Sequence, residues 1–305
     1  MFTMQPRGDF SLAAANQHFG GWIDATDTGD PVVPMTFPVE STWTPATVVV
    51  RQDGSGAVHG EVFGIEADAA PAAWQQALAI LSLDIDGSGF AAVGTRDPVI
   101  GEQQRERPGL RPVLFNSPYE AAASFTIGHR ISVVQGRALR RRMAESIGDA
   151  IDTPSGRRHA FPRPAVLLNL DGFPSLPVSK VERLHAVAAA ALDGTLDRDR
   201  LRALPEDEAL AQLRRIPGIG PFFAQGILMR GAGLVDSITD DDVTKQAVQR
   251  AYKLRSLPSY DRVVEIAEGW RPYRMWALVL LHVWFRRDAG GPMRSRSSAK
   301  RAAAE

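Results

Sequence analysis

The chain has 305 residues, of which 44% are hydrophobic and 23% charged, proportions that are ordinary for a globular protein. It contains no cysteine, which excludes disulfides, thiolate zinc sites and cysteine-bound iron–sulfur clusters. The longest apolar run, around Ala277–Phe285, is far shorter than the ~20 residues of a membrane span, and no secretory signal is visible. We therefore expect a cytoplasmic protein without a membrane partner.

The formal net charge of zero hides an uneven distribution along the chain. The first hundred residues carry twelve acidic and three basic side chains, and the remaining 205 residues carry the compensating excess of nine positive charges. Such a split suggests that a polyanion meets the second part of the chain, although local surface charge alone could produce it.

The first hundred residues predict a small β-sheet with one or two helices. Thr47–Val50 is a β-branched run, a turn signal follows at 53–56, and Ala57–Ile65 is a second extended run. Pro71–Leu83 has the apolar spacing of a helix. The tryptophans of this region are predicted to lie in its core: Trp22, Trp43 and Trp74.

The remainder of the chain predicts helices, separated mostly by proline and glycine. The segment 107–112 is interpreted as a connector with a turn. The predicted helices are Tyr119–His129, Ser132–Ile147, Val178–Leu192, Glu206–Ile216, Pro221–Arg230, Asp241–Leu254, Tyr260–Gly269 and Tyr273–Arg287. The end of the chain, 289–305, is predicted to be a disordered basic tail. The fold class is therefore α+β, with an N-terminal antiparallel β-sheet followed by a mainly α-helical core.

The most informative segment is a predicted helical hairpin at 213–233, LRRIPGIGPFFAQGILMRGAG. Its turn, 217–220, cannot continue the first helix, whereas Pro221 suits the first turn of a second one. Ile219 can fill the space between the two helices. Gly218 and Gly220 leave backbone N–H groups exposed beside a helix N-terminus, where an anion is favoured, and Arg214 adds positive charge. An ordinary tight turn would have the same sequence, but apolar helices on both sides favour DNA phosphate binding.

This hairpin resembles the helix–hairpin–helix of the DNA glycosylase superfamily, and the chain resembles more narrowly the 3-methyladenine-DNA glycosylase II family. The likeness covers about residues 97–287 and includes the connector, the 125–132 segment, the hairpin, the acidic loop Ile238–Gln246 and Trp270–Trp284. It implies a β-rich N-terminal domain at 1–97 and a glycosylase core at 98–288. That core would have a central helical subdomain at 118–233 and a second one at 98–117 plus 234–288.

Three consecutive acids, Asp240, Asp241 and Asp242, follow the hairpin. By themselves they would be interpreted as capping and solvated acids at the start of a helix. Either Thr239 or Asp240 can cap that helix. In the family, the second acid of a pair, four residues before a basic residue, is catalytic. With Lys245 as the anchor the resemblance assigns this role to Asp241, and the repeat leaves a slip of one position open.

Cleavage of an N-glycosidic bond builds positive charge on the deoxyribose, which an ionised carboxylate can stabilise while it orients or deprotonates water. An aspartate is already ionised at neutral pH, so neither a metal nor a cofactor is required. Relatives that also nick the strand carry a lysine two residues after the second hairpin glycine, where this chain has Phe222. The resemblance therefore implies hydrolysis without lyase activity.

A base in a duplex must be flipped out before its glycosidic bond can be reached, and aromatic rings would favour a cationic purine. The resemblance places Phe222 and Trp284 in the base pocket, with Phe125, Tyr273 and Trp276 as plausible neighbours. Tyr273, Trp276 and Trp284 also share one apolar helical stripe that could be pure core.

Further DNA contacts are predicted on both sides of the hairpin. Arg130 matches the family's inserting wedge position and His129 its neighbour, although the family more often has apolar or amide residues there. Phe223 of the hairpin is also predicted to contact DNA. The carbonyls of Arg214, Ile216 and Gly218 could hold a monovalent cation, by resemblance only. His185 and His282 are predicted to be structural.

The resulting prediction is a bacterial, nucleoid-associated, monomeric DNA glycosylase of base excision repair. It would release bases of the 3-methyladenine and 7-methylguanine type from damaged double-stranded DNA and leave an abasic site. A glycosylase for uracil, hypoxanthine or another adduct, or a non-catalytic lesion-binding protein, remains open at this point.

Overall fold

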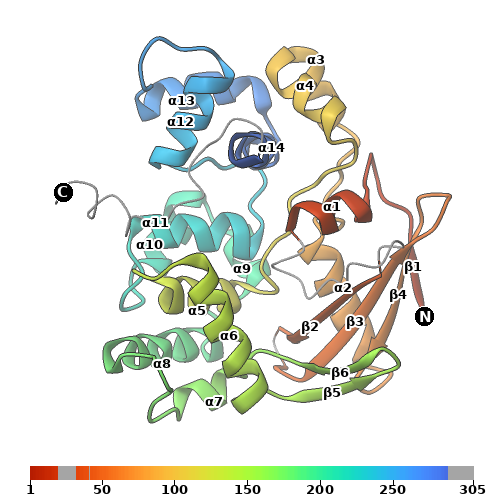
Figure 1. Ribbon diagram of the computed structural model, residues 1–305, viewed down its shortest axis with the longest axis vertical. Coiled ribbons are helices and arrows are strands. Elements are labelled where there is room, and N and C mark those ends of the chain that lie inside the picture. Colours follow the sequence, from red (N-terminus) through yellow and green to blue (C-terminus); the bar gives the residue numbers. More distant parts are fainter. Residues whose placement is uncertain (20–31, 41, 288–305) are drawn as a thin grey trace, which may run out of the picture.

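The computed structural model describes residues 1–19, 32–40 and 42–287. The predicted tail and Trp22 lie outside these residues. Figure 1 shows a β-sheet on one side of the molecule and helices along its length on the other. Within the described residues no helix is both long and apolar enough to cross a membrane.

The sheet is antiparallel with the strand order β1-β4-β3-β2, which confirms the predicted N-terminal sheet. Its strands are β1 (Phe2–Met4), β2 (Val33–Pro38), β3 (Pro45–Gln52) and β4 (Val58–Phe63). The register pairs Val48 with Val62 and Val50 with Gly60. Helices α1 (Leu12–Phe19) and α2 (Ala70–Ile80) accompany the sheet. A side chain at Gly60 would collide with Trp74 of α2, since its Cβ would lie 2.3 Å from the indole ring, so α2 packs directly on the strand.

Helices form the rest of the described chain. They are α3 (Phe90–Arg96), α4 (Pro98–Glu106), α5 (Pro118–Gly128), α6 (Val133–Ile147), α7 (Pro164–Leu168), α8 (Val178–Leu192), α9 (Arg198–Ala203), α10 (Glu206–Leu213), α11 (Pro221–Gly226), the π-helix η1 (Ile227–Ala232), α12 (Asp242–Ala251), α13 (Tyr260–Ala267), the 3-10 turn η2 (Glu268–Trp270) and α14 (Arg274–Arg287). The predicted helix Pro221–Arg230 is thus α11 followed by a π-helical turn. The short helices α3, α4, α7 and α9 were not predicted.

A two-stranded hairpin, also not predicted, interrupts the helices. Strand β5 (Ala150–Thr153) pairs with β6 (Gly156–His159) around a two-residue turn. Gly156 takes a φ of +114°, which glycine adopts readily. Asp152 and Arg157 lie opposite each other and form an ion pair. Cross-strand pairing and the turn therefore define a hairpin whose strands lack an apolar alternation.

Two hydrophobic cores hold these elements together. The first contains the inner face of the sheet, α2 and most of α14, and the second is built from α5, α8, α10 and η1. Arg111 is 1% exposed and closes the first core. Its guanidinium donates hydrogen bonds to the carbonyls of residues 7, 8, 9, 82 and 85 and lies 5.1 Å from the ring of Trp276. The N-terminal segment is thereby fastened to α14.

Candidate active site

The hairpin turn has a conformation that its glycines make possible. Gly218 has a φ of +88°, and a Cβ on it would lie 2.6 Å from Cδ of Arg183 on α8. Ile219 is only 4% exposed and packs in the second core. The turn is therefore anchored by Ile219 on one side while its glycines face outward and toward Arg183.

The outward side of the turn carries the groups that an anion needs. The backbone N–H groups of Gly218, Gly220 and Phe222 have no acceptor among the described residues. Arg214 and Arg183 lie beside them, and sequence reasoning missed Arg183 because it comes from another helix. Donors without partners beside a helix N-terminus form a phosphate-binding geometry.

The carbonyls named as a possible cation site belong to the same turn. The Ile216 carbonyl accepts the N–H of Ile219 at 3.0 Å. The carbonyls of Arg214 and Gly218 accept no hydrogen bond from the described backbone. The cation remains a prediction.

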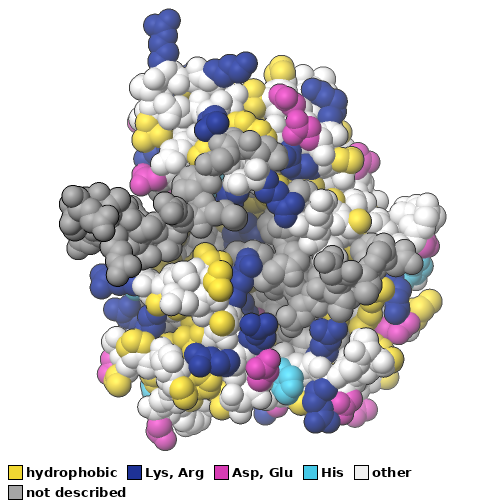
Figure 2. Space-filling view, in the orientation of Figure 1, with side chains coloured by type: hydrophobic (Ala, Val, Ile, Leu, Met, Phe, Trp, Pro, Cys, Tyr) yellow, Lys and Arg dark blue, Asp and Glu magenta, His cyan; other side chains and the backbone are white. Residues whose placement is uncertain are grey.

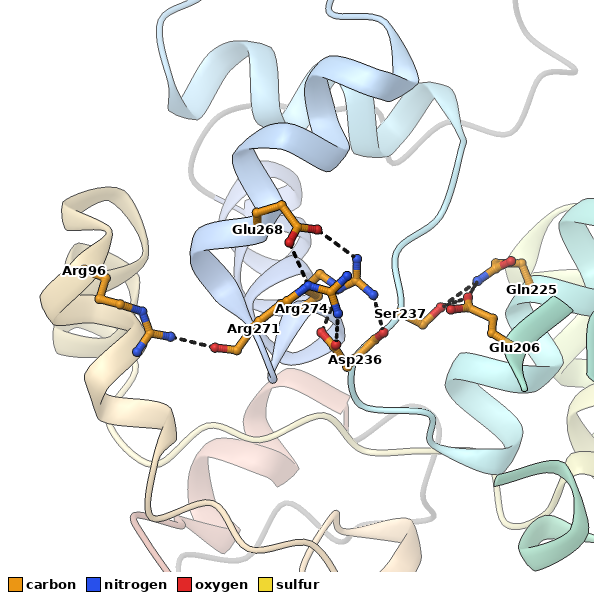
Figure 3. Close-up of polar contacts among 8 residues, drawn as sticks. All are labelled: Arg96, Glu206, Gln225, Asp236, Ser237, Glu268, Arg271 and Arg274. Atoms are coloured by element: carbon orange, nitrogen blue, oxygen red, sulfur yellow. Dashed lines mark hydrogen bonds and ion pairs between the residues drawn. The ribbon is translucent and has the colours of Figure 1, made fainter. Parts of the chain in front are cut away.

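A clamp of polar contacts fixes the loop between the hairpin and α12, which we call the Asp loop (residues 234–241). On one side Asp236 accepts a hydrogen bond from Arg274 at 2.7 Å and pairs with Arg271. On the other side Ser237 contacts Gln225 and Glu206, and Gln225 Nε2 lies 2.7 Å from the Ser237 hydroxyl. Figure 3 shows how these contacts tie the loop to α14 and to both hairpin helices. The acid at its end is thus held in a fixed relation to the hairpin.

That acid is Asp241, which is partly buried and caps α12. Its Oδ1 accepts the backbone N–H of Thr244 at 2.9 Å, and its Oδ2 accepts the hydroxyls of Thr244, at 2.8 Å, and Thr239. The helix cap is therefore Asp241. The sequence suggested Thr239 or Asp240 for this role. Asp240 instead pairs with Lys245, and Asp242 is exposed in the first helical turn.

His282 of α14, which was predicted to be structural, extends this network. Its Nε2 lies 3.1 Å from the Thr244 hydroxyl oxygen. Because Thr244 gives its single hydroxyl proton to Asp241, its oxygen can only accept from His282, so the imidazole must carry a proton on Nε2. His282, Thr244 and Asp241 thus form one directed hydrogen-bond chain.

The pKa values of the pair follow from this environment. Burial alone would raise the pKa of Asp241, but hydrogen bonds from Thr239 and Thr244 and the nearby imidazole hold it below its usual value. Burial lowers the pKa of His282 to about 4, with Arg286 and Arg230 adding to the effect and Asp241 opposing it. At neutral pH the site therefore contains a carboxylate next to a neutral imidazole.

Four predicted site residues form an aromatic cluster between α5 and α11. The rings of Phe125 and Phe223 stack with centroids 5.3 Å apart, and His129 meets Phe223 edge-on at 5.6 Å. Phe222 adjoins Phe223 and is 60% exposed, which is unusual for a large apolar side chain. The structure therefore brings Phe125, His129, Phe222 and Phe223 together beside the hairpin turn.

The predicted aromatic residues in α14 and just before it lie apart from this cluster. Trp284 is partly buried against α12, on the helix that also carries His282. Trp276 is 1% exposed between Phe90 and Arg111, and Tyr273 is 8% exposed with its hydroxyl bonded to the Asp86 carbonyl. Trp276 and Tyr273 therefore belong to the first core, because α14 presents that face to the N-terminal segment.

The predicted wedge residue Arg130 and its neighbour His129 follow α5 in a turn. Arg130 is exposed and has a φ of +59°, which is uncommon for a residue with a side chain. The preceding turn is fastened by Lys180 of α8, whose Nζ donates to the carbonyls of Ile127 at 2.6 Å and His129 at 2.8 Å. Lys180 was not predicted as a site residue because its partners lie about fifty positions away in the chain.

Comparison with known proteins supports the family resemblance. No model of a protein family matches the chain. It is 26% identical over 204 residues to DNA-3-methyladenine glycosylase of Bacillus subtilis, covering 65% of this chain and 67% of that one. It is 29% identical over 195 residues to DNA-3-methyladenine glycosylase 2 of Escherichia coli, covering 61% and 64%.

The fold is found among solved structures as well. A 3-methyladenine DNA-glycosylase from Archaeoglobus fulgidus superposes with a TM-score of 0.78 and 20% identity, over 94% of this chain and 99% of that one. The two sequence matches span about two thirds of each relative's length. The chain therefore has the fold of the helix–hairpin–helix DNA glycosylases, and its sequence relatives confirm the resemblance to the 3-methyladenine-DNA glycosylase II family.

Proposed function

We propose that the protein is a DNA glycosylase that hydrolyses the N-glycosidic bond of flipped-out alkylated bases in duplex DNA, such as 3-methyladenine and 7-methylguanine. The observation that carries this proposal is the ionised, triply hydrogen-bonded carboxylate of Asp241. The Asp loop that carries it is clamped to a hairpin with free backbone donors. The relatives named above are called DNA-3-methyladenine glycosylases.

Asp241 would act by stabilising charge. When the C1′–N bond breaks, the bonding pair leaves with the base and the deoxyribose becomes positively charged. A water oxygen then bonds to C1′, and its proton passes to the carboxylate or to solvent. Three donors on Asp241 keep it ionised and fixed in direction, so it needs no reorganisation as the charge develops.

The hairpin and the aromatic cluster would hold the substrate in place. The free N–H groups of the turn bind phosphate without reading sequence. Phe222, exposed beside Phe223, offers a stacking surface to a flipped base, and a cationic methylated purine gains most from such a ring. Arg130, which is exposed just after α5, would fill the space left in the duplex.

Strand cleavage is not expected, because the lysines that flank the hairpin in the sequence, Lys180 and Lys245, are engaged in other contacts. Phe222 stands where strand-nicking relatives have a lysine. Lys245 is paired with Asp240, which raises the pKa of its ammonium. Lys180 is 8% exposed and donates to two carbonyls. A protonated amine is a poor nucleophile, and the Lys180 amine is held by two backbone carbonyls.

The test is incubation with randomly methylated duplex DNA, followed by identification of the released bases and of strand breaks. Release of methylated purines with an alkali-sensitive, unbroken strand is expected. Borohydride trapping should give no covalent protein–DNA complex. Tight binding to an abasic-analogue duplex without release of any base would show a lesion-binding protein instead.

A further inference from the structure

A second basic site lies away from the hairpin, in a pocket of about 320 Å³. Its walls are the far half of α6, the β5–β6 hairpin and the edge strand β2. We call it the α6 pocket. It is lined by Met35, Thr36, Asn116, Glu120, Arg137, Arg140, Arg141, Ala144, Glu145, Arg157, Arg158, His159 and Phe161. Figure 2 shows Lys and Arg side chains gathered over this part of the molecule.

Positive charge exceeds negative charge in this pocket. Five arginines face two glutamates. One glutamate, Glu120, is 1% exposed and is already paired with Arg140 at 2.7 Å, and Arg157 is paired with Asp152 on β5. Arg141 and Arg158 have no hydrogen bond or ion pair within the described residues. With Glu145 as the second carboxylate, the pocket keeps an excess of positive charge, which favours an anionic ligand.

Unused polar atoms point to the same ligand. Arg140 Nε and His159 Nδ1 are buried and have no hydrogen-bond partner. The aromatic residue of the pocket, Phe161, is 3% exposed beneath the Arg140 guanidinium at 5.2 Å and so offers no surface for a base. Donors and charge without a stacking platform suit a phosphate group better than a nucleobase.

The pocket lies along the helix that follows the predicted wedge position Arg130. Helix α6 begins right after the wedge segment, capped by Ser132. Arg141 is about 13 Å along it at 1.5 Å per residue, which matches about four base pairs of duplex.

We propose that the α6 pocket binds a backbone phosphate of the substrate duplex, about four base pairs from the flipped nucleotide, through Arg141 and Arg158. This rests on the proposed function, since it concerns the same DNA. The ligand chemistry is a phosphodiester, and free phosphate is the competing source. The hairpin turn and this pocket would then hold the duplex on the two sides of the lesion.

The test uses the double variant Arg141→Gln/Arg158→Gln, because neither side chain has a contact that folding would lose. Binding to a 25-base-pair duplex with a central abasic analogue is measured by fluorescence anisotropy from 50 to 200 mM salt. Loss of one phosphate contact should lower the slope of log K against log salt by about 0.9. The wild type should therefore lose about 3.5-fold more affinity than the variant over that range.

The matched control is Arg250→Gln/Arg255→Gln, which removes two exposed arginines at and just after the C-terminal end of α12 that make no hydrogen bond or ion pair with the described residues. Its slope should equal that of the wild type. Two shortened duplexes are also tested, each trimmed to two base pairs on one side of the lesion. In one of them the salt slopes of the wild type and of Arg141→Gln/Arg158→Gln should become equal.

An unchanged salt slope in the Arg141→Gln/Arg158→Gln variant would overturn the proposal. The proposal would also be overturned if binding of inorganic phosphate required these arginines and affinity for the duplex did not. Single-turnover base release at saturating enzyme separates the two proposals. If the wild type releases no base, the proposed function fails, yet the slope still decides whether the pocket holds DNA.

Discussion

Replacing Asp241 by asparagine removes one negative charge and keeps the shape of the side chain. A unit charge about 4 Å from the developing positive charge contributes about 4 kcal/mol at an effective dielectric constant near 20. That energy corresponds to about a thousandfold in rate. The fold should tolerate the change, because asparagine caps helices as well as aspartate does and its Oδ1 can still accept the Thr244 N–H. Stability should therefore change by less than ~1 kcal/mol.

The measurement is single-turnover release of 7-methylguanine from a methylated duplex, with binding to an abasic-analogue duplex and thermal unfolding as parallel readouts. The rate of base release should fall about a thousandfold, while the affinity for the duplex and the temperature of unfolding stay near those of the wild type. Asp240→Asn and Asp242→Asn are the matched controls and should stay within about threefold of the wild-type rate, since both acids are exposed. The reasoning is refuted if Asp241→Asn keeps a tenth of the rate, or if a neighbouring variant loses as much.

Three other changes test separate parts of the site. Gly220→Val should weaken binding to damaged and intact duplexes alike without changing the melting temperature, because a Cβ there meets nothing within 4 Å; a lesion-selective loss in anisotropy would contradict phosphate binding. Lys180→Met should cost about 1–3 kcal/mol in urea unfolding and slow base release, because the carbonyls of Ile127 and His129 lose their donor; an unchanged midpoint would rule this out. Burial lowers the pKa of His282 to about 4, so the unfolded chain binds its proton first and stability falls as pH drops from about 6.5 towards 4. Between pH 7.5 and 5 the free energy of unfolding should fall by about 2 kcal/mol more in the wild type than in His282→Gln. An equal fall in both proteins would show that this histidine does not titrate as described.

The hairpin and the acidic loop could be predicted from sequence because their determinants are local. Pro217 to Pro221 encode the turn within five residues, and the family resemblance, with Lys245 as the anchor, points to Asp241. His282 could not be found in this way, because a histidine on an apolar helix resembles core and its partner Thr244 is 38 positions away. Arg183 and Lys180 escaped notice for the same reason: each contact crosses between helices.

The orientation of α14 could not be predicted from the sequence either. Ten of its fourteen residues are buried, so no single stripe identifies the face that meets a ligand. Arg111 resolves the ambiguity in the structure, because its guanidinium covers Trp276 and fixes that side inward. The β5–β6 hairpin escaped prediction because strands of four residues with charged side chains carry no period-two apolar signal.

The shared first core has a consequence for any shortened form of the protein. Helix α14 packs one side against the N-terminal segment through Trp276, and it presents His282 from the same stretch of backbone. Removing the first hundred residues would expose that helix to water and let it rotate or fray. Base release should then vanish together with the sheet, although none of the sheet's residues contacts Asp241 directly.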